Sequence, residues 1–203
     1  MVIRRTVFLV PVLQNRYVPS PPPPGIPSFP EDGFVNNPWL TLIHILPAFL
    51  FIVFGLLQFV KRIRSKHPNF HRWNGRVLLA LGAIIGTSGI VMSFKMAISG
   101  VSEIAAITFF GTLFLIALAK GFLSIRQKKI ELHREWMIRA FAIGMAVTST
   151  RPIVGIFFAT SRLTGLGPHD FFGTALWIGF TLHIIAAEVW INFTRNLKTK
   201  QEL

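Results

Sequence analysis

The sequence contains no cysteine, one tyrosine, and only 8 acidic residues against 21 lysines and arginines. Without cysteine the chain has no disulfide, no thiolate-held metal, no iron–sulfur cluster and no cysteine nucleophile. Charged residues make up 14 % of the chain, whereas a soluble globular domain has about 25 %. The sequence also lacks a glycine-rich phosphate loop, a nucleophile elbow and an HExxH zinc motif, so nothing in it supports nucleotide-dependent or hydrolytic chemistry.

Hydrophobic residues, in contrast, are abundant, at 52 % of the chain with a mean hydropathy of +0.56. They gather in five long runs. A helix of about 20 residues crosses the hydrocarbon core of a bilayer, which is about 30 Å thick. We therefore predict an all-α transmembrane helical bundle embedded in a lipid bilayer, with five spans at about 39–60, 77–98, 104–125, 133–159 and 171–193.

Three regions differ in composition. Residues 1–37 form a basic, proline-rich arm, and its run Pro21–Pro24 favours an extended polyproline conformation. Its apolar stretch Val7–Leu13 is too short to span a bilayer, so we expect an irregular arm that is flexible or bound to a partner. Residues 38–195 form the bundle, with basic loops at 61–76 and 126–135, and residues 196–203 form a basic, frayed tail.

The net charge of +13 invites comparison with nucleic-acid-binding proteins. The lysines and arginines, however, lie mostly in short stretches between the apolar runs, where they orient a chain in the membrane rather than bind nucleic acid. We therefore expect no nucleic-acid partner. With five spans, the two basic loops and the tail fall on the same side. The positive-inside rule then places the N-terminus outside and the C-terminus inside, in a membrane of the cytoplasmic type.

Two histidines on the predicted inner side stand out, His71 in HRWNGR and His133 in HREWMIR. Each precedes a long apolar run, so the two imidazoles can meet one ligand if the helix starts lie side by side. Haem b with two histidine ligands, or a quinone, would suit such a pair. The alternative is that these residues, with Arg76, Glu135 and Arg139, only satisfy helix ends and lipid head groups at the interface.

Other polar residues lie deeper in the predicted spans, where an ionisable group needs a partner or a function. His44 and Arg151 fall in the outer layer. We predict that the Arg151 guanidinium points into the bundle near His44, toward an anionic or carbonyl-bearing ligand, with pairing to Asp170 as the structural alternative. His183 falls near mid-membrane, where it can hydrogen-bond a facing helix, bind a cofactor metal or pass protons. Direct pairing of His183 with Glu188 is not expected at this spacing.

The candidate cofactor-binding residues are His44, His71, His133, His183, Arg139 and Arg151, and His71 and His133 are the candidate metal ligands.

Three segments, HRWNGRVLL, ELHREWMIRAFA with TSTRP, and FTLHIIAAEVWI, resemble the multi-pass membrane family known as domain of unknown function 2306. The similarity runs from about residue 39 to 195. It implies that several residues occupy recurring polar positions of the family, namely His44, His71, Arg76, His133, Trp136, Arg139 and Arg151. Members of that family usually have a further apolar helix upstream, where this chain has its proline-rich arm. The resemblance implies no activity.

Two functions remain open from the sequence. The first is a redox membrane protein that binds haem b or a quinone, because histidines lie on several helices. The second is a non-catalytic accessory subunit of a larger membrane complex. This second hypothesis rests on the small size, the proline-rich arm, and Gly82, Gly86 and Gly89, which would let a neighbouring helix approach closely. A small transporter has less support, because we find no internal repeat.

Overall fold

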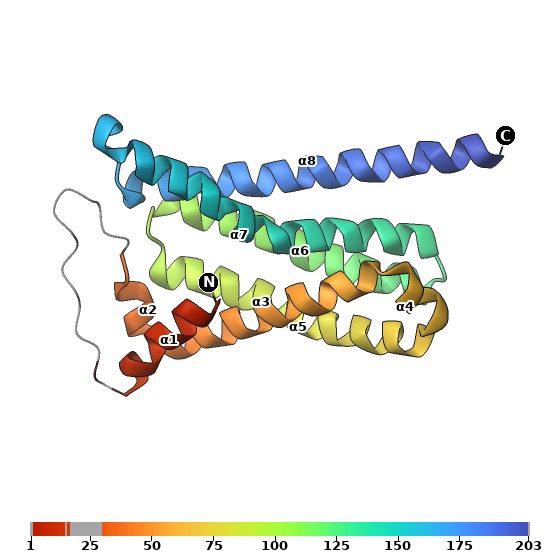
Figure 1. Cartoon of the computed structure of the whole chain (residues 1–203), viewed down its shortest axis with the longest axis horizontal. Helices are drawn as coiled ribbons and strands as arrows, with labels where there is room; N and C mark the ends of the chain where they lie inside the picture. The colour runs from red at the N-terminus through yellow and green to blue at the C-terminus, as the bar shows by residue number, and fades with distance from the viewer. Residues whose placement is uncertain (1, 15, 17–29, 203) are drawn as a thin grey trace.

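The computed structural model describes residues 2–14, 16 and 30–202, with side chains for 6–14, 16 and 30–197. This part of the chain is helical throughout, with short turns (Figure 1). The helices are α1 (Val2–Leu13), α2 (Asp32–Asn36), α3 (Pro38–Phe59), α4 (Lys61–Lys66), α5 (Pro68–Met96), α6 (Val101–Arg126), α7 (Ile130–Thr164) and α8 (Pro168–Glu202).

The prediction of an all-α bundle with five spans is confirmed. α3, α5, α6, α7 and α8 are each long and apolar enough to cross a membrane. Successive spans run in opposite directions (Figure 1), as short connections between long helices require.

The predicted loop at 61–76 is wrong, because this segment is helical. α4 covers 61–66 and α5 starts at Pro68, which occupies a first-turn position. We had expected Pro68 to interrupt the segment. Proline instead favours a helix start, because its fixed φ suits the first turn and its missing N–H would have no intrahelical acceptor there. Pro38 and Pro168 begin α3 and α8 in the same way.

Two other boundaries differ from those expected. α7 continues past residue 159 and ends at Thr164. The next residue, Gly165, caps the helix with a φ of 72°, a left-handed conformation that suits glycine. α8 continues through 196–202, so the frayed tail that we expected is helical over those residues. The arm is likewise helical at both of its ends, in α1 and α2, where we expected irregular structure. Its run Pro21–Pro24 lies outside the described residues.

The bundle packs in sequence order. α3 packs on α5, α5 on α6, α6 on α7 and α7 on α8, while α6 also contacts α8. α6 is therefore the central helix, and its Phe110 and Phe114 are buried. Phe110 stacks on Phe180 with ring centroids 4.7 Å apart, and Phe114 meets Phe51 edge-on at 5.6 Å. α1 packs on α3 and buries Leu9 completely.

The glycines of α5 serve contacts within this chain. A β-carbon on Gly82 would lie 2.6 Å from Leu118 Cδ1, and one on Gly86 would lie 2.6 Å from Leu115 Cδ2, so both glycines allow α6 to approach. A β-carbon on Gly89 would lie 3.2 Å from His44 Cε1. The small-residue face that we had assigned to an external neighbour is thus covered by α3 and α6.

The two ends of the bundle have different characters. We call one the basic end; it holds α4, the turn at 127–129 and the C-terminal part of α8 (Figure 1, right). We call the other the α2 end; it holds α2, the loop at 97–100 and the turn at 165–167 (Figure 1, left).

Candidate functional site

His71 and His133 lie together at the basic end. His71 is in the first turn of α5 and His133 in the first turn of α7. Both helices start at the basic end, and Arg64 of α4 lies at that end too. The fold therefore places these two predicted metal ligands at the same end of the bundle, and their role as ligands stays a prediction.

The His133 ring is fixed by the backbone of α6. Its Nδ1 lies 2.8 Å from the Gly121 carbonyl oxygen. A carbonyl can only accept, so Nδ1 carries the proton and the neutral ring keeps a lone pair on Nε2. An Nδ1–H bonded to a carbonyl is the usual support of a metal-ligating histidine. At Gly121 a β-carbon would lie 2.8 Å from Sδ of the Met137 side chain of α7.

His71 has an unsatisfied ring nitrogen. Its Nδ1 is buried and has no hydrogen-bond partner among the described residues. The surrounding backbone is nevertheless held firmly: Gln58 Nε2 donates to the His71 carbonyl oxygen at 3.1 Å, and the buried Asn74 Nδ2 donates to the Phe54 carbonyl oxygen at 2.9 Å. A buried polar atom left unpaired costs about 1–3 kcal/mol, so this nitrogen is a candidate contact for a ligand.

Arg139 is paired to acids on two helices. Its Nε and Nη2 donate to the two Glu188 carboxylate oxygens of α8 at 2.5 and 2.9 Å. Its Nη1 lies 3.9 Å from Glu135 Oε2. The buried Glu135 in turn accepts two hydrogen bonds from Arg195 of α8. These four residues, which we call the charge quartet, join α7 to α8 and balance one another.

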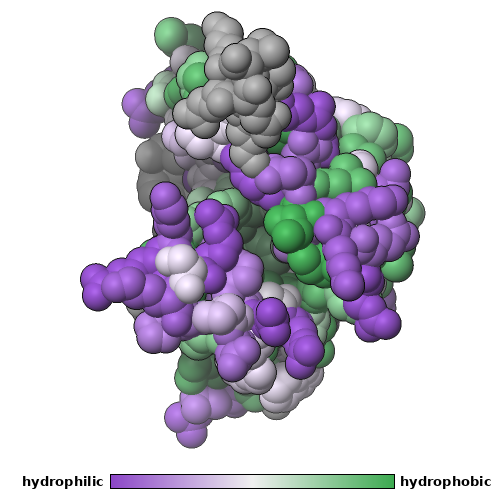
Figure 2. Space-filling model, turned by 90° about the vertical axis from the view of Figure 1, so that its right-hand side faces the viewer, coloured by the Kyte–Doolittle hydropathy of each residue, from purple (hydrophilic) through white to green (hydrophobic). Residues whose placement is uncertain are grey.

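Trp136 lies between this quartet and α6. Lys120 Nζ is 4.7 Å from its ring centroid, and Arg139 Cζ is 4.8 Å from it, so two cations contact one aromatic ring. Figure 2 looks onto the basic end. It shows groups of hydrophilic residues with hydrophobic residues visible between them. Lysines and arginines of α4, α6 and α7 thus lie at the same end as His71 and His133.

The other two predicted histidines lie away from this pair. His44 Nδ1 is 3.0 Å from Ser88 Oγ of α5. His183 Nδ1 is 3.1 Å from Ser149 Oγ of α7 and 3.0 Å from the Gly179 carbonyl oxygen. Each histidine therefore joins two neighbouring helices through a serine. For His183 this is the hydrogen bond to a facing helix that we had considered, and its role in cofactor binding stays a prediction.

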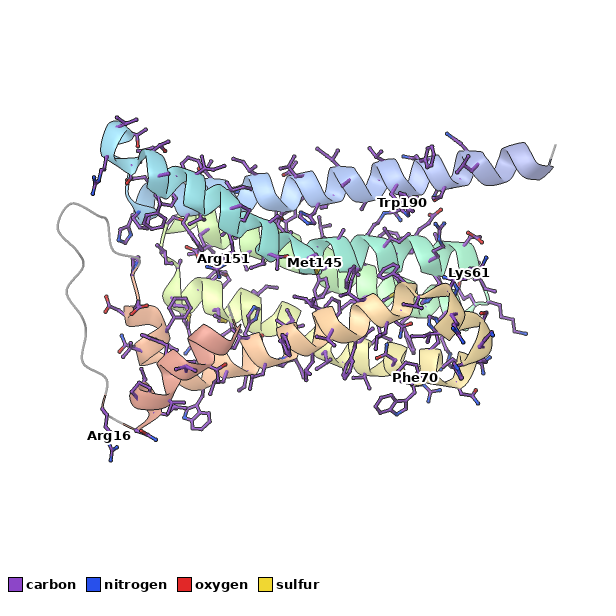
Figure 3. All side chains as sticks on the ribbon, in the orientation of Figure 1. Arg16, Lys61, Phe70, Met145, Arg151 and Trp190 are labelled. Carbon is purple, nitrogen blue, oxygen red and sulfur yellow. The ribbon has the colours of Figure 1, made fainter. Side chains whose placement is uncertain are left out.

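Arg151 is exposed on α7 (Figure 3). Its predicted orientation toward His44 and a ligand stays a prediction. Asp170, which we had considered as its structural partner, accepts a hydrogen bond from the Gly167 backbone N–H at 2.8 Å and so holds the turn before α8.

A bare metal ion would need more ligands than this site offers. No group of three or more histidine, cysteine or acidic residues able to hold a metal ion occurs among the described residues. Two imidazoles suffice only for a metal that brings its other ligands with it. Haem iron does so, because the porphyrin supplies four nitrogens.

Sequence reasoning missed the charge quartet. It had named Arg139 as a possible ligand contact and had considered Glu188 only beside His183. A signal was present: Glu135 and Arg139 are four residues apart, and Glu188 and Arg195 are seven apart, so each acid–arginine set shares one helix face. When two such helices pack antiparallel, the glutamate of each helix faces the arginine of the other. The sequence alone did not identify α7 and α8 as contacting along those faces.

The chain is similar to known proteins at the level of a family. The family model described as "Predicted membrane protein (DUF2306)" matches residues 41–191. No curated protein and no solved structure matches the chain.

Proposed function

The chain belongs to the DUF2306 family of predicted membrane proteins, and we propose that it binds haem b between His71 and His133 as a redox protein of the membrane. The family and the five apolar helices make it an integral membrane protein. The cofactor and the redox role are our proposal.

One observation supports the proposal most directly. His71 and His133 lie in the first turns of two different spans at the same end of the bundle, and each has a ring nitrogen that forms no hydrogen bond within the described part of the chain. On His133 that nitrogen is Nε2, because Nδ1–H is bonded to the Gly121 carbonyl. On His71 it is the buried Nδ1 without a partner.

In this proposal each residue has a limited role. His71 and His133 would hold the iron. The Gly121 carbonyl fixes the His133 ring, while Gln58 and Asn74 fix the start of α5. Bound haem b would take one electron from a reduced donor and give it to an oxidised acceptor. Arg64, at the same end of the bundle, would favour the reduced iron because it carries one positive charge fewer.

Two alternatives from the sequence are weighed against this proposal. A quinone could use the same imidazoles, which would hydrogen-bond its carbonyl oxygens. An accessory role with other membrane subunits now rests on the small size and the proline-rich arm, because α3 and α6 cover the glycine face of α5. The histidine pair therefore favours a cofactor-binding protein.

The test is an absorption spectrum of the full chain, purified in mild detergent from cells supplied with haem. We expect a Soret band at about 410–430 nm. His71→Ala and His133→Ala should each abolish it. His67→Ala is the matched control, because His67 is exposed at the same end and should leave the band unchanged.

Four outcomes decide between the alternatives. A wild-type protein that stays colourless contradicts haem binding. A Soret band that survives both alanine variants contradicts the assigned ligands. A colourless protein whose organic extract contains a quinone, lost in the His71 and His133 variants, supports the quinone version. Co-purification of stoichiometric partner subunits with a colourless, quinone-free protein supports the accessory role.

A further inference from the structure

A pocket at the α2 end has no role in the proposed haem site. It has a volume of about 310 Å³ and lies between α2, the end of α5 and the start of α8. Its polar lining residues are Asp32, Asn36, Asn37, Lys95 and His169. A pocket of this size suits a small ligand or the head group of a lipid.

The walls of this pocket are held in place. α2 sits directly against the end of α5, since a β-carbon on Gly33 would lie 2.6 Å from Met96 Cβ. The Asn37 side chain donates to the Gly33 carbonyl oxygen at 3.1 Å. His169 Nδ1 donates to the Ile98 carbonyl oxygen at 2.6 Å, which ties the start of α8 to the loop at 97–100. The pocket is therefore bounded by elements that contact one another.

Two opposite charges face this pocket from different walls. Asp32 comes from α2 and Lys95 from the last turn of α5. Neither forms an ion pair within the described part of the chain. Asn36 and Asn37 add amide donors and acceptors beside them. Such a lining matches a ligand that carries a cation and an anion a few bonds apart.

The position of the pocket narrows the ligand class. α3 starts at Pro38 and α5 ends at Met96, so the pocket lies where two spans leave the membrane, at the level of lipid head groups. We propose that it binds a zwitterion made of a primary ammonium and a phosphate, as in a phosphoethanolamine head group. The ammonium would donate to the Asp32 carboxylate, and the phosphate would accept from Lys95.

A primary ammonium distinguishes this ligand from choline. The trimethylammonium of phosphatidylcholine has the same charge but no N–H to donate to Asp32 or to an asparagine carbonyl. Lipids of the two kinds, otherwise identical, therefore form a matched pair of probes. Free phosphoethanolamine carries the same chemistry without acyl chains and distinguishes a soluble ligand from a lipid.

The test uses the full chain in nanodiscs made of equal parts phosphatidylethanolamine and phosphatidylcholine, with bound lipid counted by native mass spectrometry. We expect phosphatidylethanolamine to be retained about tenfold more than phosphatidylcholine. Asp32→Asn and Lys95→Gln should each remove most of this preference. Lys66→Gln, an exposed cation at the basic end, should leave it intact.

A second arm adds free phosphoethanolamine to the protein in phosphatidylcholine nanodiscs and measures the unfolding temperature. A rise that Asp32→Asn and Lys95→Gln abolish, without lipid preference in the first arm, supports the zwitterion site and assigns it to a soluble ligand. Equal retention of both lipids and no rise overturn the proposal. The proposal is also overturned if Asp32→Asn and Lys95→Gln lower the unfolding temperature by the same amount in the presence and in the absence of either ligand. That result would indicate a purely structural role for Asp32 and Lys95.

Discussion

At the basic end, α7 and α8 are joined by ion pairs between side chains. At the α2 end, side chains of α6 and α8 instead form hydrogen bonds with the backbone of the loop at 97–100. The charge quartet supplies the first kind of contact, for example between Arg139 and Glu188. Glu103 supplies the second. Its carboxylate accepts from the Ile98 and Ser99 backbone N–H groups at 2.6 and 2.9 Å, while His169 donates to the Ile98 carbonyl.

The difference has a physical consequence. A contact between two side chains can be rebuilt by changing both partners together, because their chemistry is set by the sequence at both positions. A contact with the backbone cannot, because every residue presents the same N–H and C=O. We therefore expect the α7–α8 side-chain pairs at the basic end to tolerate paired exchanges, and the Glu103 and His169 contacts at the α2 end to depend on single residues.

The largest effect is expected for Glu103→Leu. Glu103 is buried, and its loss leaves the Ile98 and Ser99 N–H groups without an acceptor, at about 1–3 kcal/mol each. The total of about 2–6 kcal/mol, at about 2–4 °C per kcal/mol for a chain of this size, should lower the unfolding temperature in detergent by about 4–24 °C.

Glu131→Leu is the control for this measurement. Glu131 is exposed at the basic end and lies 4.0 Å from Arg134, so its loss should change stability by less than about 0.5 kcal/mol. Equal effects of the two substitutions would contradict the importance assigned to the backbone contacts of the α2 end.

The next effect concerns the pair Arg139–Glu188. Glu188→Gln keeps the shape of the side chain but removes its charge, which should cost about 1–2 kcal/mol because this charged hydrogen-bonded pair is only partly buried. The corresponding fall in unfolding temperature is about 2–8 °C, measured in the same detergent.

The double exchange Arg139→Glu with Glu188→Arg sharpens the comparison. It restores an arginine–carboxylate pair between α7 and α8, although with a reversed charge next to Glu135 and Trp136. We expect it to be more stable than either single exchange. A double variant as unstable as the sum of the two singles would show that the basic end is no more exchangeable than the α2 end.

The sequence was sufficient for the parts of the fold that depend on long apolar runs. Five runs of membrane-crossing length gave the five spans, and the family resemblance agrees with the match over residues 41–191. The sequence also predicted that His71 and His133 lie at the same end of the bundle, because each is at the start of a span and those two spans run in the same direction. Local composition determines both results.

The remaining contacts could not be predicted because they depend on which helix faces pack together. Ser88 and Ser149, the partners of His44 and His183, are ordinary residues in apolar runs, and nothing local marks them. The pairing of Arg139 with Glu188 required knowing that α7 packs on α8. The helical segment at 61–76 was missed for another reason: Pro68 was interpreted as a helix breaker, although proline suits a first turn.

The smallest effect is expected from adding one methyl group at each end. At Gly173, near the α2 end, a β-carbon would lie 2.9 Å from Ser102 Cβ and 2.6 Å from its Oγ. The β-carbon of Ser102 is fixed to the backbone of α6. Gly173→Ala should therefore force α6 and α8 apart and lower the free energy of unfolding by about 1 kcal/mol. At Gly121, toward the basic end, the nearest atom is the sulfur of the flexible Met137 side chain, at 2.8 Å. That side chain can turn away, and alanine favours a helix over glycine by about 0.5–1 kcal/mol, so Gly121→Ala should be neutral in thermal unfolding. If Gly121→Ala proves the more damaging change, the α6–α7 contact that fixes His133 is tighter than the contacts of the α2 end.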